Sequence, residues 1–393
     1  MLSRRSFLQS SSLLALSSTV PLFVTRSAAG MPPAKDSRVL VVVELDGGND
    51  ALNTVVPYAD ENYAKFRPKL KLDPKRLVKL NASVGLHPAM RPLDKLFQAG
   101  HLGVIPGVSY PNPNRSHFES MAVWHTMRFG VDDRKGYGWL GRAMDPSGGN
   151  LFSVGSEVPT ALRGRRSSAV AFNRIEEVLL SDAVAVKQGI GSDSSDDLLA
   201  FVRRQAVDAQ VAADKLAKLA TLSGEKGGPS YPPTRLADRL RLVSRLLKAD
   251  VGACVFYTQQ SGYDTHAQQL FTHSNLLGEF AGAVAAFFAD LKESKLADRV
   301  TLLAFSEFGR TIKENGSAGT DHGTTGVMFM AGPSVKGGVV GTMPSLTDLD
   351  NGEPKRTTDF RSVYAAALRD WLAVPTDGLF GEGFEAVKLF VDR

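Results

Sequence analysis

The apolar positions of this chain fall into short runs rich in β-branched residues. Residues 38–45 and 300–305 are nearly continuous apolar runs, and shorter ones occupy residues 102–106, 251–257 and 327–330. Continuous runs of this kind are typical of strands buried on both faces of a parallel sheet. We therefore predict five core strands in these segments.

Helical spacing appears between the apolar runs. It is found at residues 87–98, 236–248, 276–291 and 359–372. Strands that alternate with helices indicate an α/β fold with a mostly parallel central sheet sandwiched by helices. We expect residues 30–393 to form one such domain.

The middle of the chain has a different character. Residues 140–250 begin with loops rich in Gly, Arg and Ser and continue with a charged helical segment at 196–222. We interpret residues 140–250 as a helical and loop cap inserted between the two halves of one core.

The first 29 residues have the features of a targeting segment. Arg4 and Arg5 precede a short, serine-rich apolar stretch, and small residues follow at Ala28 and Ala29. This order predicts a twin-arginine signal peptide cleaved after Ala29. The twin-arginine translocase would then be a transient partner, and the mature protein would be periplasmic or otherwise exported. A retained anchor is the alternative, but the apolar stretch is short for a bilayer span.

Composition narrows the function classes. Hydrophobic residues make up 43% and charged residues 22% of the chain, as in globular proteins. The formal net charge is only +5 and the basic residues are spread out, which argues against nucleic-acid binding. Cys254 is the only cysteine, so neither a disulfide nor a cysteine metal cluster is expected.

Polar clusters follow or precede the predicted strands. Asp46 follows the first strand, Asp264 and His266 the third, and Glu307 and Arg310 the fourth, while Asp321 and His322 precede the fifth. Ligands of parallel α/β sheets bind beyond the carboxyl ends of the strands. Carboxylate and imidazole groups together are the ligand set of zinc, manganese and related ions. We therefore expect these clusters to form one divalent-metal site.

Ser116 and His117 lie in the loop after the second strand. Ser116 begins the pattern Ser-His-Phe-Glu, which predicts a capping box at the start of a helix. A serine at a helix N-terminus can also be a nucleophile, because the free amide groups there stabilise an anion. Both roles stay open. We expect His87, His101 and His273 to be structural and His125 to lie in the core.

The motifs together resemble a bacterial family called domain of unknown function 1501. The motifs are Leu-Asp-Gly-Gly-Asn-Asp (45–50), Gly-Tyr-Asp-Thr-His (262–266), Phe-Ser-Glu-Phe-Gly-Arg-Thr (305–311) and Gly-Thr-Asp-His-Gly (319–323). That family is similar in layout to the alkaline phosphatase–sulfatase superfamily. The resemblance implies an alkaline phosphatase-like fold.

The resemblance also implies one or two metal ions. A first ion would be held by Asp264, His266 and His322, and a second by Asp46, Ser116, Glu307 and Asp321. Glu307 stands where the superfamily usually has Asp, and Phe308 where it usually has a metal-binding His. Zinc, manganese and calcium are the expected ions.

The leading hypothesis is an exported metal-dependent hydrolase of phosphate or sulfate esters. Ser116 would attack the anionic ester or orient the nucleophile, Arg310 or Arg115 would stabilise the transferring group, and His117 would be a general acid. The sequence Ser109-Tyr110-Pro111-Asn112-Pro113 departs from the formylglycine signature at its last position, so no formylglycine sulfatase is predicted.

Two other hypotheses belong to different classes. A non-catalytic envelope protein would keep the fold and a stabilising metal and would bind a glycan or a protein. An oxidoreductase is the third possibility, but the chain has neither a dinucleotide-binding fingerprint nor cysteine ligands for an iron–sulfur cluster.

Overall fold

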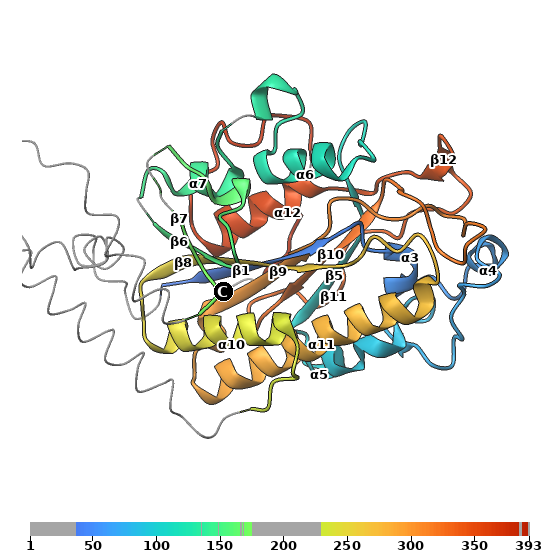
Figure 1. Ribbon diagram of the computed structural model, residues 1–393, viewed down its shortest axis with the longest axis horizontal. Helices are drawn as coiled ribbons and strands as arrows, with labels where there is room; N and C mark the ends of the chain where they lie inside the picture. Colours follow the sequence, from blue (N-terminus) through green and yellow to red (C-terminus); the bar gives the residue numbers. More distant parts are fainter. Residues whose placement is uncertain are drawn as a thin grey trace, which may run out of the picture.

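A twisted sheet with helices on both faces forms the centre of the protein (Figure 1). The computed structural model describes residues 37–174 and 229–391, except 135, 148, 166, 168, 385 and 386. The signal segment 1–29 and the predicted helix 196–222 lie outside the described residues. No helix in the described ranges is both long and apolar enough to cross a membrane.

The central strands are parallel neighbours. β1 (Val39–Asp46) pairs in parallel with β8 (Ala253–Ser261) on one side and with β9 (Val300–Phe305) on the other. β10 (Gly326–Ala331) then pairs antiparallel with β9 and with β5 (Leu102–Ser109). The predicted mostly parallel α/β sheet is thus confirmed, with β10 as its antiparallel member.

Short strands complete both edges of the sheet. β6 (Asn150–Val154) pairs in parallel with β8 and with β7 (Ala169–Phe172), while β11 (Gly338–Val339) and β14 (Thr358–Asp359) pair in parallel with β5. Residues 150–172 were expected to belong to the inserted cap. They instead extend the core sheet, because Leu151, Phe152 and Val154 alternate between the two buried faces.

The apolar side chains of β1 alternate between two cores. Val39, Val41 and Val43 point toward α10 (Arg235–Lys248), α11 (Gln269–Glu293) and η1 (Pro88–Leu93). Leu40 and Val42 point to the opposite face, which other helices cover (Figure 1). The covering elements there are α6 (His117–Thr126), α7 (Trp139–Met144), α12 (Phe360–Ala366) and η7 (Ala367–Trp371).

Helix α10 shows a second difference from the expected cap. Its buried side chains, Leu236, Leu240, Val243 and Leu247 among them, belong to the core that also contains β1 and α11. The predicted boundary at residue 250 is therefore wrong for this helix. The apolar residues of α10 recur on one face of the helix, and that face packs against the sheet of the main domain.

Smaller elements connect these strands and helices. α3 (Ala51–Thr54), β2 (Val55–Val56), α4 (Glu61–Phe66), β3 (Val78–Lys79), β4 (Gly85–Leu86) and α5 (Asp94–Gln98) lie between β1 and β5 in the chain. The others are η2 (Asp132–Arg134), η3 (Thr160–Leu162), η6 (Ala297–Arg299), β12 (Leu349–Asp350) and β13 (Glu353–Pro354).

Candidate functional site

The loops at the carboxyl ends of β1, β8 and β9 lie against one another. Gly47, directly after β1, has φ +118°, and a Cβ there would lie 2.5 Å from the backbone nitrogen of Asp264. Only glycine permits this approach of two loop backbones. It places the loop after β8, which carries Asp264 and His266, beside the end of β1.

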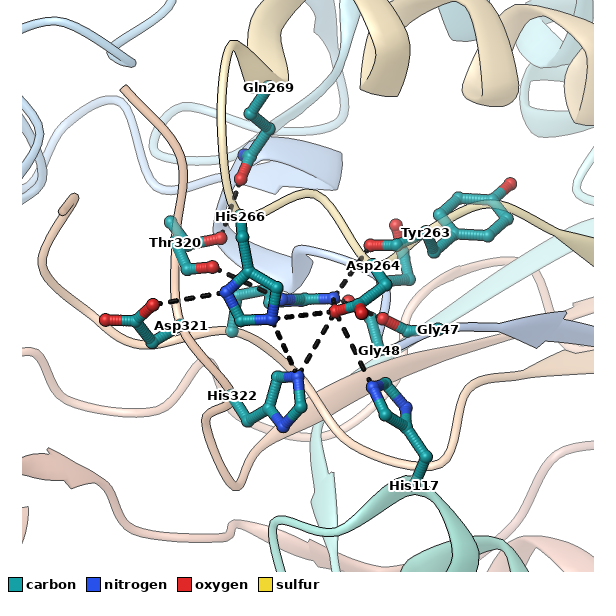
Figure 2. A network of polar contacts seen from close by, with 12 residues as sticks. Gly47, Gly48, His117, Tyr263, Asp264, His266, Gln269, Thr320, Asp321 and His322 are labelled. Atoms are coloured by element: carbon teal, nitrogen blue, oxygen red, sulfur yellow. Dashed lines mark hydrogen bonds and ion pairs between the residues drawn. The ribbon is translucent and has the colours of Figure 1, made fainter. Parts of the chain in front are cut away.

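Four nitrogen-bearing side chains surround one carboxylate oxygen, Oδ1 of Asp264 (Figure 2). Nε2 of His266 lies 2.9 Å from it, Nε2 of His322 3.2 Å and Nε2 of His117 3.5 Å. The Nε2 atoms of His266 and His322 are 2.9 Å apart. Residues from the loop after β8, from the segment before β10 and from the start of α6 therefore meet at one point.

The other ring nitrogen of each histidine is held by the protein. Nδ1 of His117 lies 2.7 Å from Oε1 of Glu307, and Nδ1 of His266 lies 3.2 Å from Oδ1 of Asp321. Nδ1 of His322 donates to the carbonyl oxygen of Arg115 at 2.7 Å. All three rings are thus oriented with Nε2 toward Asp264.

Glu307 is buried beneath this cluster, with its side chain fully shielded from solvent. Its Oε1 also accepts the backbone N–H of Gly47 at 3.0 Å, and its Oε2 accepts the hydroxyl of Ser306 at 3.0 Å. Both carboxylate oxygens are therefore engaged by protein donors. Glu307 ties the end of β1 to the His117 ring.

Arg310 is buried as well, and this differs from its predicted place at the substrate. Its guanidinium donates to the carbonyl oxygens of four residues and to Asp264 at 2.6 Å. The four are Gly47, Gly48, Tyr263 and Thr320. A guanidinium that is hydrogen-bonded to loop carbonyls cannot also bind a phosphoryl group. Arg310 therefore links the loops to one another.

The electrostatics of the cluster follow from these contacts. Partial burial raises the pKa of Asp264, but the hydrogen bond and charge of Arg310 outweigh it, and the pKa falls to about 2. The hydrogen bond to Glu307 raises the pKa of His117 above its ordinary value. Asp264 is therefore an anion at neutral pH, facing imidazoles that can neutralise it.

Asp46 lies at the end of β1, opposite Ser261 in the strand pairing. Burial and then the charge of Glu307 raise its pKa above the usual aspartate value. The charge of His117 acts on it in the opposite direction. Asp46 thus lies close enough to the cluster to interact with it electrostatically.

Ser116 is at the N-terminus of α6, but it does not form the predicted capping box. Its side chain makes no capping hydrogen bond, and its backbone N–H donates to Oδ1 of Asn114. Glu119, the other half of the expected box, pairs instead with Arg134. The capping interpretation of Ser116 is therefore wrong.

The structure brings together the residues of one of the two predicted sets of metal ligands but not those of the other. Asp264, His266 and His322 come together, and His117 joins them: ligand atoms of His117, Asp264 and His322 all lie within 4.8 Å of one another. Among the described residues no other group of this kind is found. Asp46, Glu307 and Asp321 do not converge on a second point, because Glu307 and Asp321 contact different histidine rings.

The positions of His117 and Arg115 in the site differ from the roles expected from the sequence. His117 was expected to be a general acid, yet its Nε2 points at the same carboxylate oxygen as the other two histidines. Arg115 contributes a backbone oxygen, which no side-chain pattern reveals. The adjacency of Arg115, Ser116 and His117 was the only available signal.

Comparison with known proteins places the chain in a family. A sequence model described as "Protein of unknown function (DUF1501)" matches residues 37–368. The chain belongs to this family. The resemblance seen in the DUF1501 motifs is thereby confirmed. No curated protein matches the sequence.

Several solved structures are similar to this DUF1501 protein. The C-terminal periplasmic domain of EcEptC from Escherichia coli, in complex with Zn, is 10% identical with a TM-score of 0.43, covering 88% of this chain and 85% of that one. The lipoteichoic acid synthase LtaP from Listeria monocytogenes is 10% identical with a TM-score of 0.39, covering 91% and 80%. The phosphonate monoester hydrolase of Agrobacterium radiobacter is 10% identical with a TM-score of 0.37, covering 88% and 79%.

Proposed function

We propose that this protein is an exported metal-dependent hydrolase of phosphate or sulfate esters. The observation that carries the proposal is the convergence of three histidine Nε2 atoms on one oxygen of Asp264, with every Nδ1 held from behind. Histidines that ligate metals almost always have the other ring nitrogen bonded to a carboxylate or carbonyl. The arrangement around His117, His266 and His322 has that form.

The spacing of the donor atoms suits a small divalent ion. A tetrahedral zinc site with bonds of about 2.0–2.2 Å separates its ligand atoms by about 3.3 Å. Four of the separations among the three Nε2 atoms and Oδ1 are 2.9, 2.9, 3.2 and 3.5 Å. In addition, Nε2 of His117 is buried without a hydrogen-bond partner. A buried nitrogen without a partner is costly unless something else binds it.

The donor types narrow the choice of metal. Three imidazole nitrogens and one carboxylate oxygen favour zinc or another nitrogen-binding ion over calcium, which prefers oxygen ligands. His117, Asp264, His266 and His322 would hold this one ion. Glu307, Asp321 and the carbonyl of Arg115 would orient the imidazoles rather than hold a second ion.

When bound, such a metal would offset charge on the transferring group, and it would lower the pKa of the nucleophile only if the nucleophile became a further ligand beside the four protein groups. Ser116 remains the candidate nucleophile, since its hydroxyl is not used to cap α6. Asp46 is a candidate for moving a proton, because its raised pKa lets it carry one at a higher pH than an ordinary aspartate. The Glu307 carboxylate fixes the His117 ring while these groups act.

One observation favours the non-catalytic alternative, a metal-stabilised envelope protein that binds a glycan or a protein. The arginine nearest the cluster, Arg310, is buried and bonded to loop carbonyls and to Asp264 instead of facing a transferring group. An enzyme of this type usually presents cations to the developing charge. The alternative predicts metal binding without ester hydrolysis.

A hydrolysis assay distinguishes the two functions. The mature protein, purified from the periplasm, would be tested on p-nitrophenyl phosphate and p-nitrophenyl sulfate with zinc or manganese added. We expect turnover that chelation abolishes. Ser116→Ala should lower kcat by about a thousandfold or more with metal content unchanged. Ser317→Ala, an exposed serine in a neighbouring loop, is the matched control. Stoichiometric metal without turnover of any ester would support the non-catalytic function.

Export is tested separately. The motivation is the Arg4-Arg5 pair before a serine-rich apolar stretch. Replacing both arginines with lysine should leave the protein in the cytoplasm, as cell fractionation would show. Unchanged periplasmic delivery of the double variant would contradict the proposed twin-arginine export.

A further inference from the structure

A polar cavity adjoins the histidine cluster. Its volume is about 610 Å³, and it lies among the loop after β5, the segment before β10 and the β12–β13 hairpin. Cavities that bind small molecules commonly have volumes of about 300–1,000 Å³. This one is large enough for a sugar-sized group.

The cavity shares a wall with the site. Arg115 lines it, and the carbonyl oxygen of the same residue accepts the Nδ1 proton of His322. Thr324, two residues beyond His322, also lines it, and its carbonyl oxygen accepts the hydroxyl of Ser109 at 2.6 Å. A molecule bound at the cluster can therefore extend into the cavity.

The lining carries excess positive charge. Arg115, Lys355 and Arg356 line the cavity against one acidic residue, Asp350. Lys355 is paired with Asp348, and both side chains are largely exposed. The guanidinium groups of Arg115 and Arg356 have neither a hydrogen bond nor an ion pair within the described ranges. Guanidinium groups bind phosphate and sulfate through paired, charge-assisted hydrogen bonds.

The remaining lining is suited to hydroxyl groups. Ser109, Asn112, Thr324 and Asn351 present hydroxyl and amide groups, which donate to and accept from sugar hydroxyls. Tyr110, Pro111, Pro113 and Pro354 also line the cavity, but its polar surface is the larger part, which is a poor environment for an acyl chain. The lining therefore favours a carbohydrate over a lipid tail.

We propose that this cavity binds the distal part of the substrate, a sugar unit carrying a second phosphate or sulfate group, through Arg115, Lys355 and Arg356. The proposal rests on the proposed function for the role of the neighbouring cluster. The substrate class is a sugar ester with two anionic groups, one of which lies at the cluster and the other in the cavity.

Calorimetry on metal-stripped protein tests the cavity apart from the metal. Glucose 6-phosphate and inorganic phosphate are the probes, and glucose 6-sulfate replaces the first in a second series to compare the two anions. The variant is Lys355→Gln combined with Arg356→Gln. Lys71→Gln combined with Lys75→Gln removes the same charge at exposed positions outside the cavity and is the control.

We expect the wild type and the control to bind glucose 6-phosphate or glucose 6-sulfate at least about tenfold more tightly than the cavity variant, the loss expected when charged hydrogen bonds are removed. Equal affinity of the cavity variant and the control would overturn the proposal, as would absence of binding to wild type. Equal affinity for inorganic phosphate and glucose 6-phosphate would overturn the sugar part.

The metal-loaded protein adds the second half of the test. There, in a Ser116→Ala background that prevents turnover of the esters during the titration, glucose 1,6-bisphosphate should bind at least about tenfold more tightly than glucose 6-phosphate, and the cavity variant should lose that advantage. If the protein takes up no metal, the proposed function fails, while the result on stripped protein still decides the cavity. The two failures are therefore distinguishable.

Discussion

Two clusters of carboxylate, imidazole and arginine lie in neighbouring parts of the molecule and differ in how far solvent reaches them. In the buried one, Asp50 and Arg67 are fully shielded from solvent and pair at 2.5 Å. In the histidine cluster, the side chains of Asp264 and His266 are 48% and 44% exposed. The buried cluster is closed to ligands, and the histidine cluster can receive one.

Charge in the buried cluster is balanced from within. Asp50 accepts hydrogen bonds from Arg67 and from Gln269 at 2.5 Å, and burial lowers the pKa of His273 to about 3. His273 therefore stays neutral. Each charged group there has a partner, as stability requires of buried ions.

The buried cluster also positions the histidine cluster. Oε1 of Gln269 accepts the hydroxyl of Thr320 at 2.6 Å, and Nη2 of Arg67 donates to the carbonyl of Thr311 at 2.8 Å. Thr320 lies two residues before His322. The same residue types therefore hold loops together where they are buried, and they are candidate metal ligands where they are accessible to solvent.

The largest expected effect is the loss of the buried pair. Arg67→Met leaves Asp50 charged and unpaired, which should lower the free energy of unfolding by about 3–5 kcal/mol. Urea denaturation measures it. Lys65→Met, on the same helix α4, removes an exposed pair with Glu61 at 3.0 Å and should cost less than about 1 kcal/mol. Equal losses of unfolding free energy in the two variants would contradict the expected difference between the buried and the exposed ion pair.

Acid should act on the buried histidines before it acts on Asp50. Burial lowers the pKa of His87 to about 4 and that of His273 to about 3. Their stabilising contribution is complete above the unfolded value of about 6.5 and is lost as pH falls toward those values, at up to about 1.4 kcal/mol per pH unit for each histidine. Urea denaturation of metal-stripped protein from pH 7 to pH 4 measures the slope. His273→Gln should reduce the slope of unfolding free energy against pH, and His266→Gln should leave most of that slope. The reverse pattern would contradict the conclusion that the buried histidines cause the acid sensitivity.

A smaller effect is expected from the groups that orient the rings. Glu307→Gln keeps the shape of the side chain but removes the charge that supports His117, so metal affinity should fall by about 10–100-fold. Competition with a fluorescent chelator measures the affinity. Glu293→Gln, at the exposed end of α11, is the control and should leave it unchanged. An unchanged affinity in Glu307→Gln would remove His117 from the ligand set.

The apolar pattern was sufficient to predict the sheet and the edge at which the candidate site lies. The near-continuous apolar runs at β1, β8 and β9 predict adjacent buried strands, and Asp46, Asp264 and Glu307 follow as residues at one edge. The structural assignment of His273 also agrees with its burial. These features depend on local pattern, which a sequence carries directly.

The roles within the site depended on contacts between distant segments. Arg310 was expected to face the substrate, since a guanidinium is a planar bidentate donor for phosphoryl oxygens. Its burial arises because three loops turn their carbonyl oxygens toward it. The failed capping box at Ser116 has a similar cause, because Glu119 found a partner in Arg134, fifteen positions further along.

The central claim is that the histidine cluster binds a metal ion, and metal stoichiometry tests it most directly. Elemental analysis of wild type, His322→Ala and His101→Ala, each purified without chelator and equilibrated with equimolar zinc, gives the answer. Wild type and His101→Ala should retain about one equivalent, and His322→Ala, which loses one ligand of the cluster, should retain little. Full metal content in His322→Ala, or no metal in wild type, would contradict the account.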